Sequence, residues 1–139
     1  MAKKPIVMID INIFLDVLQK REPFYGTSAG LLAAVETGQV QGYMAAHSLT
    51  TLFYLVQKGR SSAEARVTIT NLLQFIHIAP VDQSTIEQAL NLETRDFEDA
   101  VQMVSALQVK ADFLITRNVK DFQPALLPVL PPVDFLGTL

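Results

Sequence analysis

Apolar and polar positions change period along this chain, and the changes predict short strands that alternate with helices. The run "IVMI" (6–9) is apolar and rich in β-branched residues, which is typical of a strand buried on both faces. From Ile11 the apolar residues recur at helical spacing through Phe14 and Leu18, and this helix should end near "KREP". Asp10 lies at the junction, directly after the strand and directly before the helix.

The same alternation continues to the carboxyl end of the chain. We expect helices over about 27–37, 48–58, 61–76, 82–92 and 96–110, strands over 42–46, 77–81 and 112–116, and a short edge strand in the proline-rich tail "LLPVLPPVDFL". Strands alternating with helices favour an α/β fold, with a parallel sheet covered by helices on both faces. A length of 139 residues suits one domain, residues 1–139, around one core.

Helical spacing also predicts which side chains face that core. The expected inward residues are Leu31, Leu32 and Val35 in the second helix and Ala100, Met103, Val104 and Leu107 in the last. The fourth helix begins with a serine cap and an acidic first turn, and its apolar positions are Val67, Leu72 and Leu73. Gly38 is expected to stop the second helix.

Composition limits the environment and the partners of the protein. The formal net charge is -3, so no overall positive field would attract a polyanion and any nucleic-acid contact must be local. Arg117, Lys120 and Lys58 are the candidates for such contacts. No apolar run reaches the length of a membrane span, no signal-peptide pattern is present and the chain has no cysteine, so we expect a soluble, cytoplasmic protein.

Candidate chemistry lies at two strand ends. In open parallel sheets the ligand crevice lies beyond the carboxyl ends of the strands, where the strand order reverses. Asp10 ends the first strand, and Thr116, Arg117 and Asn118 follow "FLI". The sequence contains no glycine-rich phosphate loop, HExxH or GxSxG motif. Carboxylates are therefore the remaining candidates for catalytic or metal-binding groups.

Two of these carboxylates begin the last long helix, in "RDFEDAVQMVSAL". Asp96 and Asp99 are three residues apart and project from the first turn toward the same region. A capping role for Asp96 and a dipole role for Asp99 explain the pattern equally well at this point. A site for Mg²⁺ or Mn²⁺ needs two or more carboxylates held together, and the fold could bring Asp10 to Asp99. Of the histidines, we interpret His77 as structural and keep His47 as a weak candidate.

Two segments carry a resemblance to a known family. "VMIDINIFLDVLQKREPF" and "DFEDAVQMVSALQVKADFLITRNVKDF" together resemble the PIN-domain family of small metal-dependent ribonucleases, which includes the toxins of many bacterial toxin–antitoxin pairs. The likeness spans nearly the whole chain in order and spacing. It implies a three-layer α/β/α domain with a central parallel sheet and an acidic pocket for Mg²⁺ or Mn²⁺. It also implies RNA as substrate, an antitoxin protein as partner and a homodimer.

The resemblance assigns roles to residues that match the family motifs. Asp10 and Asp99 would bind the metal, with Asp96 as an additional carboxylate, and Asn118 and Asp121 would complete the catalytic set. Asn12, Thr116, Arg117 and Lys120 would contact or shape the bound substrate. Phe24, Tyr25 and Phe53 are candidates for a partner or dimer surface.

One segment departs from the family pattern and leaves alternatives open. The family usually places a glutamate on the helix after the second strand, whereas "AAHSLTTLFYLVQK" contains no acid, and Thr50 or Thr51 stands at that position. A catalytically impaired module that binds RNA or a partner protein is therefore the alternative function, with His47 or Asp96 as replacements if catalysis persists. A phosphotransferase with Asp10 as nucleophile ranks last, because that class needs a second aspartate where Asn12 stands.

Overall fold

The computed structural model describes residues 3–139 and contains a five-stranded parallel sheet. The strands are β1 (Ile6–Ile9), β2 (Gln41–Ala45), β3 (Ile76–Ala79), β4 (Phe113–Ile115) and β5 (Val129–Leu130), in the spatial order β3-β2-β1-β4-β5. The chain builds outward from β1 to β3 and then returns to place β4 on the other side of β1. The strand order therefore reverses between β1 and β4, whose carboxyl ends carry Asp10 and Thr116.

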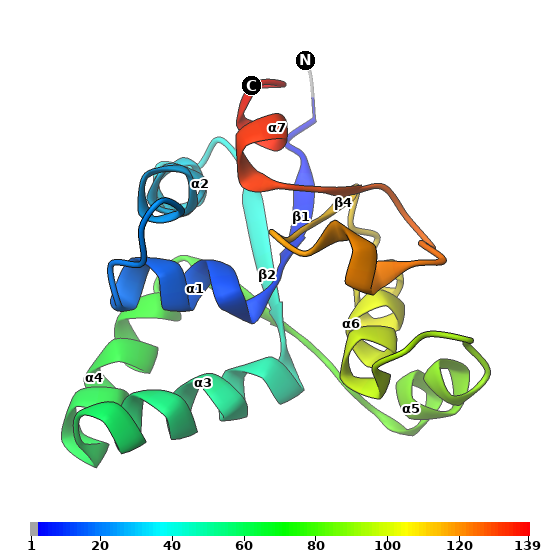
Figure 1. The fold of residues 1–139 in the computed structure, drawn as a ribbon, viewed down its shortest axis with the longest axis horizontal. Coiled ribbons are helices and arrows are strands. Elements are labelled where there is room, and N and C mark those ends of the chain that lie inside the picture. The colour runs from blue at the N-terminus through cyan, green and yellow to red at the C-terminus, as the bar shows by residue number, and fades with distance from the viewer. Residues whose placement is uncertain (1–2) are drawn as a thin grey trace.

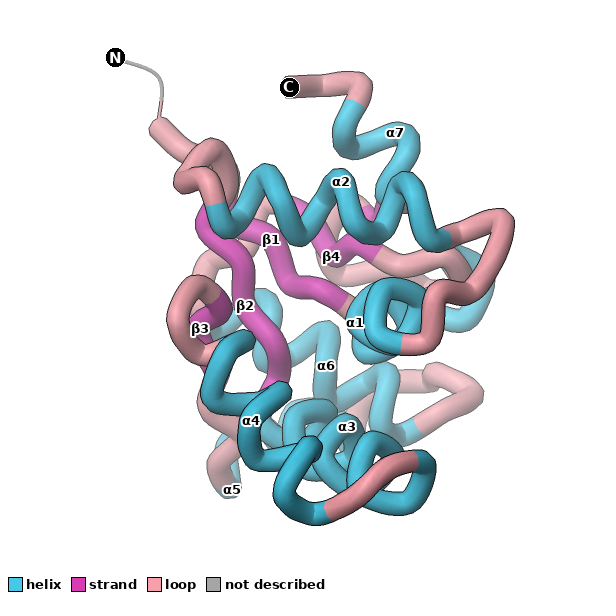
Figure 2. Tube along the Cα trace, turned by 90° about the vertical axis from the view of Figure 1, so that its left-hand side faces the viewer, coloured by secondary structure: helices cyan, strands magenta, loops and turns pink. Residues whose placement is uncertain are grey.

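Helices cover both faces of this sheet, which confirms the predicted three-layer α/β/α fold (Figure 1). The helical segments are α1 (Ile11–Leu18), α2 (Tyr25–Glu36), α3 (Ala46–Gly59), α4 (Ser62–Leu72), α5 (Gln83–Leu90), α6 (Phe97–Gln108), the 3-10 turn η1 (Val119–Phe122) and α7 (Pro132–Leu136). In Figure 2, α2 crosses in front of β1 and β2, on the face opposite α6.

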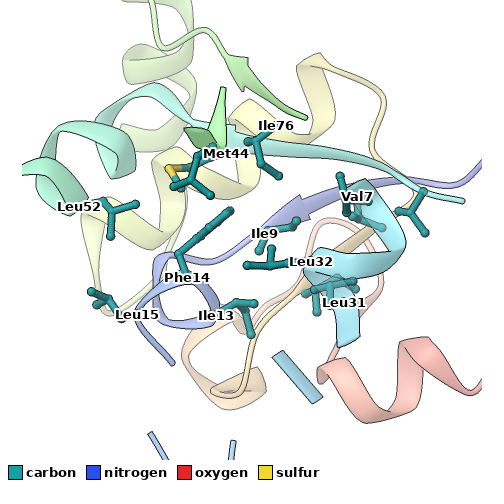
Figure 3. Packing of buried hydrophobic residues seen from close by; sticks show 14 of the residues in the cluster. Val7, Ile9, Ile13, Phe14, Leu15, Leu31, Leu32, Met44, Leu52 and Ile76 are labelled. Atoms are coloured by element: carbon teal, nitrogen blue, oxygen red, sulfur yellow. The ribbon is translucent and has the colours of Figure 1, made fainter. Parts of the chain in front are cut away.

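Alternation along β1 divides the core between the two faces. Val7 and Ile9 point into the larger cluster, formed with α1 to α4 and α7, where Phe14 lies fully buried at the centre (Figure 3). Met8 points to the opposite face and packs with side chains of α6 and η1. Burial on both faces explains why this strand is apolar throughout.

Gly42 allows the larger face to pack closely. A Cβ at this position in β2 would lie 2.9 Å from a methyl group of Val35 in α2 and 3.1 Å from Ile9 in β1. Gly38, after α2, has φ +86, and it stops that helix as predicted because a side chain would be strained there.

One side-chain prediction was wrong. Leu107 is exposed by 43%, although helical spacing placed it on an inward face, and the apolar Val67 and Leu73 of α4 are exposed by 61% and 48%. In α6 every residue from 100 to 106 is buried, because the sheet and α5 enclose that stretch from more than one side, whereas Leu107 lies beyond it. The predicted edge strand is β5, and the prolines after it begin α7, which the sequence analysis missed.

Candidate active site

Asp10 directly follows β1 and occupies the N-cap position of α1, so its backbone joins the two elements. Its side chain does not cap the helix and is 5% exposed. The hydroxyl of Thr116 donates a hydrogen bond to Asp10 Oδ2 at 3.0 Å, and the side-chain amide of Asn12 lies 3.5 Å from the same oxygen. One hydrogen bond from the end of the neighbouring strand and one from the first turn of α1 therefore orient this carboxylate.

The loop after β4 supplies the next group of predicted residues. Thr116 is fully buried, and its Oγ1 also accepts a hydrogen bond from the backbone N–H of Asn118 at 3.1 Å. Asn118 is exposed and lies at the N-cap of η1, where its side chain makes no capping hydrogen bond. Lys120 and Asp121 follow in η1, both exposed.

The start of α6 supplies the remaining carboxylates. Asp96 caps the helix: its Oδ1 accepts from the backbone N–H of Glu98 at 2.8 Å and of Asp99 at 3.4 Å. This confirms the capping alternative for Asp96. Asp99 is half-buried in the first turn of the helix, and its charge interacts with those of Asp96, Asp10 and Asp121.

Burial raises the pKa values of the two central acids, and neighbouring negative charges add to this effect at Asp99. Burial raises the pKa of Asp10, while its hydrogen bonds with Thr116 and Asn12 act in the opposite direction. Burial, together with the negative charges of Asp96, Asp10 and Asp121, raises the pKa of Asp99 to about 7. Carboxylates that repel one another in this way form a site that a divalent cation would stabilise.

His47 connects the start of α3 with the start of α6. Its Nε2 lies 3.2 Å from the carbonyl oxygen of Glu98, and a carbonyl can only accept, so Nε2 carries the proton. Nδ1 is buried and has no hydrogen-bond partner among residues 3–139. The hydroxyls of Thr50 and Thr51 both donate to the carbonyl oxygen of His47, so they face their own helix backbone.

The three predicted phosphate contacts, Arg117, Lys58 and Lys120, lie in different surroundings. Arg117 donates to Asp16 through Nε at 2.7 Å and Nη2 at 3.0 Å, so its guanidinium is already paired. Lys58 lies in the last turn of α3, roughly 18 Å along the helix from its start. Lys120 is the predicted cation beside Asn118 in the loop.

Asp16 is the residue that the sequence analysis left without a role. It is fully buried in α1, where it pairs with Arg117 and accepts a hydrogen bond from Ser28 at 3.0 Å. The signal was present in "IFLDVL", because one charge within an apolar helix requires a buried partner.

Aromatic residues that we expected at a partner surface are partly covered. Phe53 and Tyr25 are half-buried, and Phe24 lies beneath the Arg117 guanidinium, 3.8 Å from ring centroid to Cζ. Tyr54, at 59% exposure, is a much more exposed aromatic side chain. His77 is exposed on β3, where its ring contacts that of Tyr43 at a centroid distance of 5.3 Å.

The oxygen donors fit a divalent cation held by few protein ligands. Within residues 3–139, no three Asp, Glu or His side chains form a ready-made metal-binding group, so the additional metal role predicted for Asp96 gains no support. Mg²⁺ is commonly bound by one or two carboxylates and completed by waters and substrate phosphates. Asp10 and Asp99 are the two carboxylates that the fold offers for such binding, and burial raises the pKa of both.

The fold and the site together define a class: a doubly wound parallel α/β domain with a group of acidic residues at its topological switch point. The sequence model of the PIN domain matches residues 6–120. The chain therefore belongs to the PIN-domain family, which confirms the resemblance inferred from the motifs.

Solved structures agree with this fold at low sequence identity. A toxin–antitoxin complex from Klebsiella pneumoniae has a TM-score of 0.68 at 22% identity, covering 91% of this chain and 97% of that chain. VapBC2 from Rickettsia felis, bound to a DNA fragment from its promoter, has a TM-score of 0.67 at 18% identity, and the match covers 90% of this chain and 96% of that chain. Mycobacterium tuberculosis VapC20, a Sarcin-Ricin loop cleaving toxin, has a TM-score of 0.61 at 14% identity, and the match covers 78% of this chain and 86% of that chain.

A comparison with curated proteins found no match. Among the residues that the structure describes, no helix has both the length and the apolar character needed to cross a membrane.

Proposed function

We propose that this protein is a metal-dependent endoribonuclease and acts as the toxin of a toxin–antitoxin pair. The observation that carries the proposal is the group of acids at the switch point of the strand order, where burial raises the pKa values of both Asp10 and Asp99. Membership of the PIN-domain family and the similarity to toxin structures support the same function.

The side chains divide the work of phosphodiester hydrolysis. Bound Mg²⁺ or Mn²⁺ would neutralise charge on the scissile phosphate and polarise it. Asp10 and Asp99 would hold the ion, and the Thr116 hydroxyl keeps the Asp10 carboxylate in place. The side-chain amide of Asn118 would donate to a phosphate oxygen, and the Asp121 carboxylate would accept a hydrogen bond from the attacking water.

Local charge would compensate for the acidic chain when RNA approaches. Lys120 is exposed in η1, beside Asn118, and would contact a neighbouring phosphate. One or two such contacts predict modest affinity with a shallow dependence on salt concentration. Asn12 would shape the Asp10 side of the same pocket.

The decisive experiment compares single carboxylate variants on labelled single-stranded RNA in Mn²⁺, Mg²⁺ or EDTA. Asp10→Asn and Asp99→Asn should each reduce cleavage by about a thousandfold, since each removes a charge that holds the cation. Asp134→Asn in α7 is the matched control, because this exposed acid lies outside the crevice, and it should cleave like the wild type. Unchanged cleavage by Asp10→Asn contradicts the assignment.

A binding module without catalysis is the second candidate, and the absence of an acid between Ala45 and Lys58 favours it. Calorimetry separates the two functions. Saturable Mn²⁺ binding that Asp10→Asn abolishes supports the nuclease, whereas no binding at millimolar Mn²⁺, together with no cleavage, supports the module.

An antitoxin partner also follows from the neighbours, which were solved as toxin–antitoxin complexes. An apolar groove of about 380 Å³ lies between α1, α2 and α4 and has Leu18, Ala33 and Phe75 among its lining residues. Such a groove suits an amphipathic segment of another protein. We also propose that the protein forms a homodimer and acts in the cytoplasm. Analytical ultracentrifugation of the purified protein tests the dimer.

A further inference from the structure

The Asp16–Arg117 pair is built as a fixed clamp. Asp16 is fully buried and receives the Nε and Nη2 atoms of Arg117 in a two-pronged contact, with a third hydrogen bond from Ser28. A buried carboxylate is tolerated only when its partners satisfy it, so releasing Arg117 would leave an unpaired charge in the interior.

An aromatic ring adds a second constraint to the guanidinium. The face of Arg117 lies over the ring of Phe24, which precedes α2, at 3.8 Å from the centroid. Its side chain is only 19% exposed. The planar fork is therefore held at its edge by a carboxylate and on its face by a ring, which a lysine cannot reproduce.

The position of Arg117 in the chain gives this clamp a functional meaning. Its neighbours are Thr116, which donates to Asp10, and Asn118, whose backbone N–H donates to Thr116 Oγ1. Anchoring of the Arg117 side chain between α1 and α2 therefore fixes the backbone that carries both site residues.

We propose that Arg117 is a positioning residue, clamped by Asp16, that holds the loop 116–118 in register with Asp10 and does not bind the RNA phosphate. The kinetic part of this inference rests on the proposed nuclease function, whereas the structural part does not.

The structural test uses NMR on Arg117→Met, Asp16→Asn and the double variant. Each single variant should shift the Asn118 amide signal and accelerate its hydrogen exchange by about tenfold, because the loop loses its anchor. The double variant should be no worse than either single variant, because the pair acts as one unit. Arg66→Met is the matched control, since Arg66 is an exposed arginine over another ring, that of Phe53, and it should leave Asn118 unchanged.

The kinetic test measures kcat and KM for RNA cleavage in the same proteins. Positioning predicts that Arg117→Met and Asp16→Asn lower kcat by about 10- to 100-fold with KM nearly constant, since a small misplacement of reacting groups is costly. Arg117→Lys should not restore kcat. A phosphate contact predicts the reverse: a raised KM in Arg117→Met, recovery in Arg117→Lys and no loss in Asp16→Asn.

Two outcomes would overturn the proposal. One is the kinetic pattern of a phosphate contact, in which Arg117→Met raises KM and Arg117→Lys recovers it. The other is an unchanged Asn118 amide signal in both single variants. If the wild type shows no metal-dependent cleavage, the nuclease proposal fails and the NMR comparison alone decides the positioning role. If Asp16→Asn does not fold, Ser28→Ala removes only the hydroxyl that donates to Asp16 and should shift Asn118 in the same direction.

Discussion

The two central carboxylates of the crevice are held in opposite ways. Asp10 is buried and receives hydrogen bonds from side chains on the neighbouring strand end and the first turn of α1. Asp99 is half-buried at the start of α6, and the residues that the structure describes donate no hydrogen bond to its carboxylate. The charged groups that raise its pKa are all acids.

This difference separates a preorganised half of the site from an incomplete half. The β1 and β4 ends fix Asp10 before any ligand arrives, so little reorganisation is needed there. The α6 end accumulates negative charge that only protons or a cation can relieve. Both carboxylates should therefore contribute to cation affinity, but the pH dependence of that affinity should come from Asp99, and the geometry of the site from Asp10 and its hydrogen-bond partners.

The largest expected effect comes from breaking the preorganised half. Thr116→Val removes the hydroxyl that donates to the Asp10 carboxylate and should lower the free energy of unfolding at pH 8 by about 2–3 kcal/mol. Urea denaturation measures this loss, and Thr116→Ser should recover most of it. Thr70→Val is the control: its hydroxyl bonds the Arg66 carbonyl on an exposed surface, and a comparable loss there would contradict the explanation.

A smaller effect should appear in the incomplete half, as a dependence of metal affinity on pH. Protons compete with the cation at Asp99, whose pKa of about 7 places the competition near neutrality. Mn²⁺ affinity measured by calorimetry should fall by about 10- to 30-fold from pH 7.5 to 5.5 and change little above pH 8. The same slope in Asp99→Asn would show that another group controls the binding.

The ionised Asp99 carboxylate should also lower the stability of the metal-free protein. The pKa of Asp99 is about 7 in the folded protein, against 3.8 for an ordinary aspartate, so the folded state binds this proton more tightly than the unfolded state does. The contribution of Asp99 to the free energy of unfolding is therefore fully present below pH 4 and is lost as the pH rises through 7. Asp99→Asn should therefore stabilise the protein at pH 8 by about 1 kcal/mol, allowing for solvent screening, and give no gain at pH 4. Thermal unfolding at both pH values checks the sign, and a gain of equal size at pH 4 would exclude this cause.

The smallest effect should follow from removing one neighbouring charge while keeping the helix cap. Asp96→Ser retains an oxygen that accepts from the first turn of α6 but removes the negative charge beside Asp99. The pKa of Asp99 should then fall below its present value, which a carbon-detected NMR titration of the side-chain carboxyl can follow. Stability should change by less than about 0.5 kcal/mol.

The local elements and the two halves of the site could be predicted from sequence because their signals are local. The strand "IVMI" ends at Asp10, the acidic turn begins α6, and parallel pairing brings Asp10 beside Thr116. Each inference needed only the hydrophobic periodicity, a helix-capping residue or the rule that ligands bind at the carboxyl ends of parallel strands.

The remaining features depend on tertiary contacts that no local pattern encodes. Asp16 and Arg117 are 101 residues apart, so their pairing could not be deduced from spacing. Helical periodicity correctly identified Ala100, Met103 and Val104 as buried residues. It could not show that the elements packed against α6 end before Leu107, which is exposed. The assignments of Asn118, Asp121 and Lys120 stay predictions, since they depend on a bound substrate.

The reversal of strand order also has a consequence during protein synthesis. The contact between Thr116 and Asp10 joins residues 106 positions apart, so the crevice requires β4 to insert beside β1 after most of the chain exists. Such nonlocal pairing forms late and slowly compared with helical contacts. A nascent chain that ends before Thr116 holds Asp10 without its partner. The site can therefore be completed only after nearly the whole chain has been synthesised.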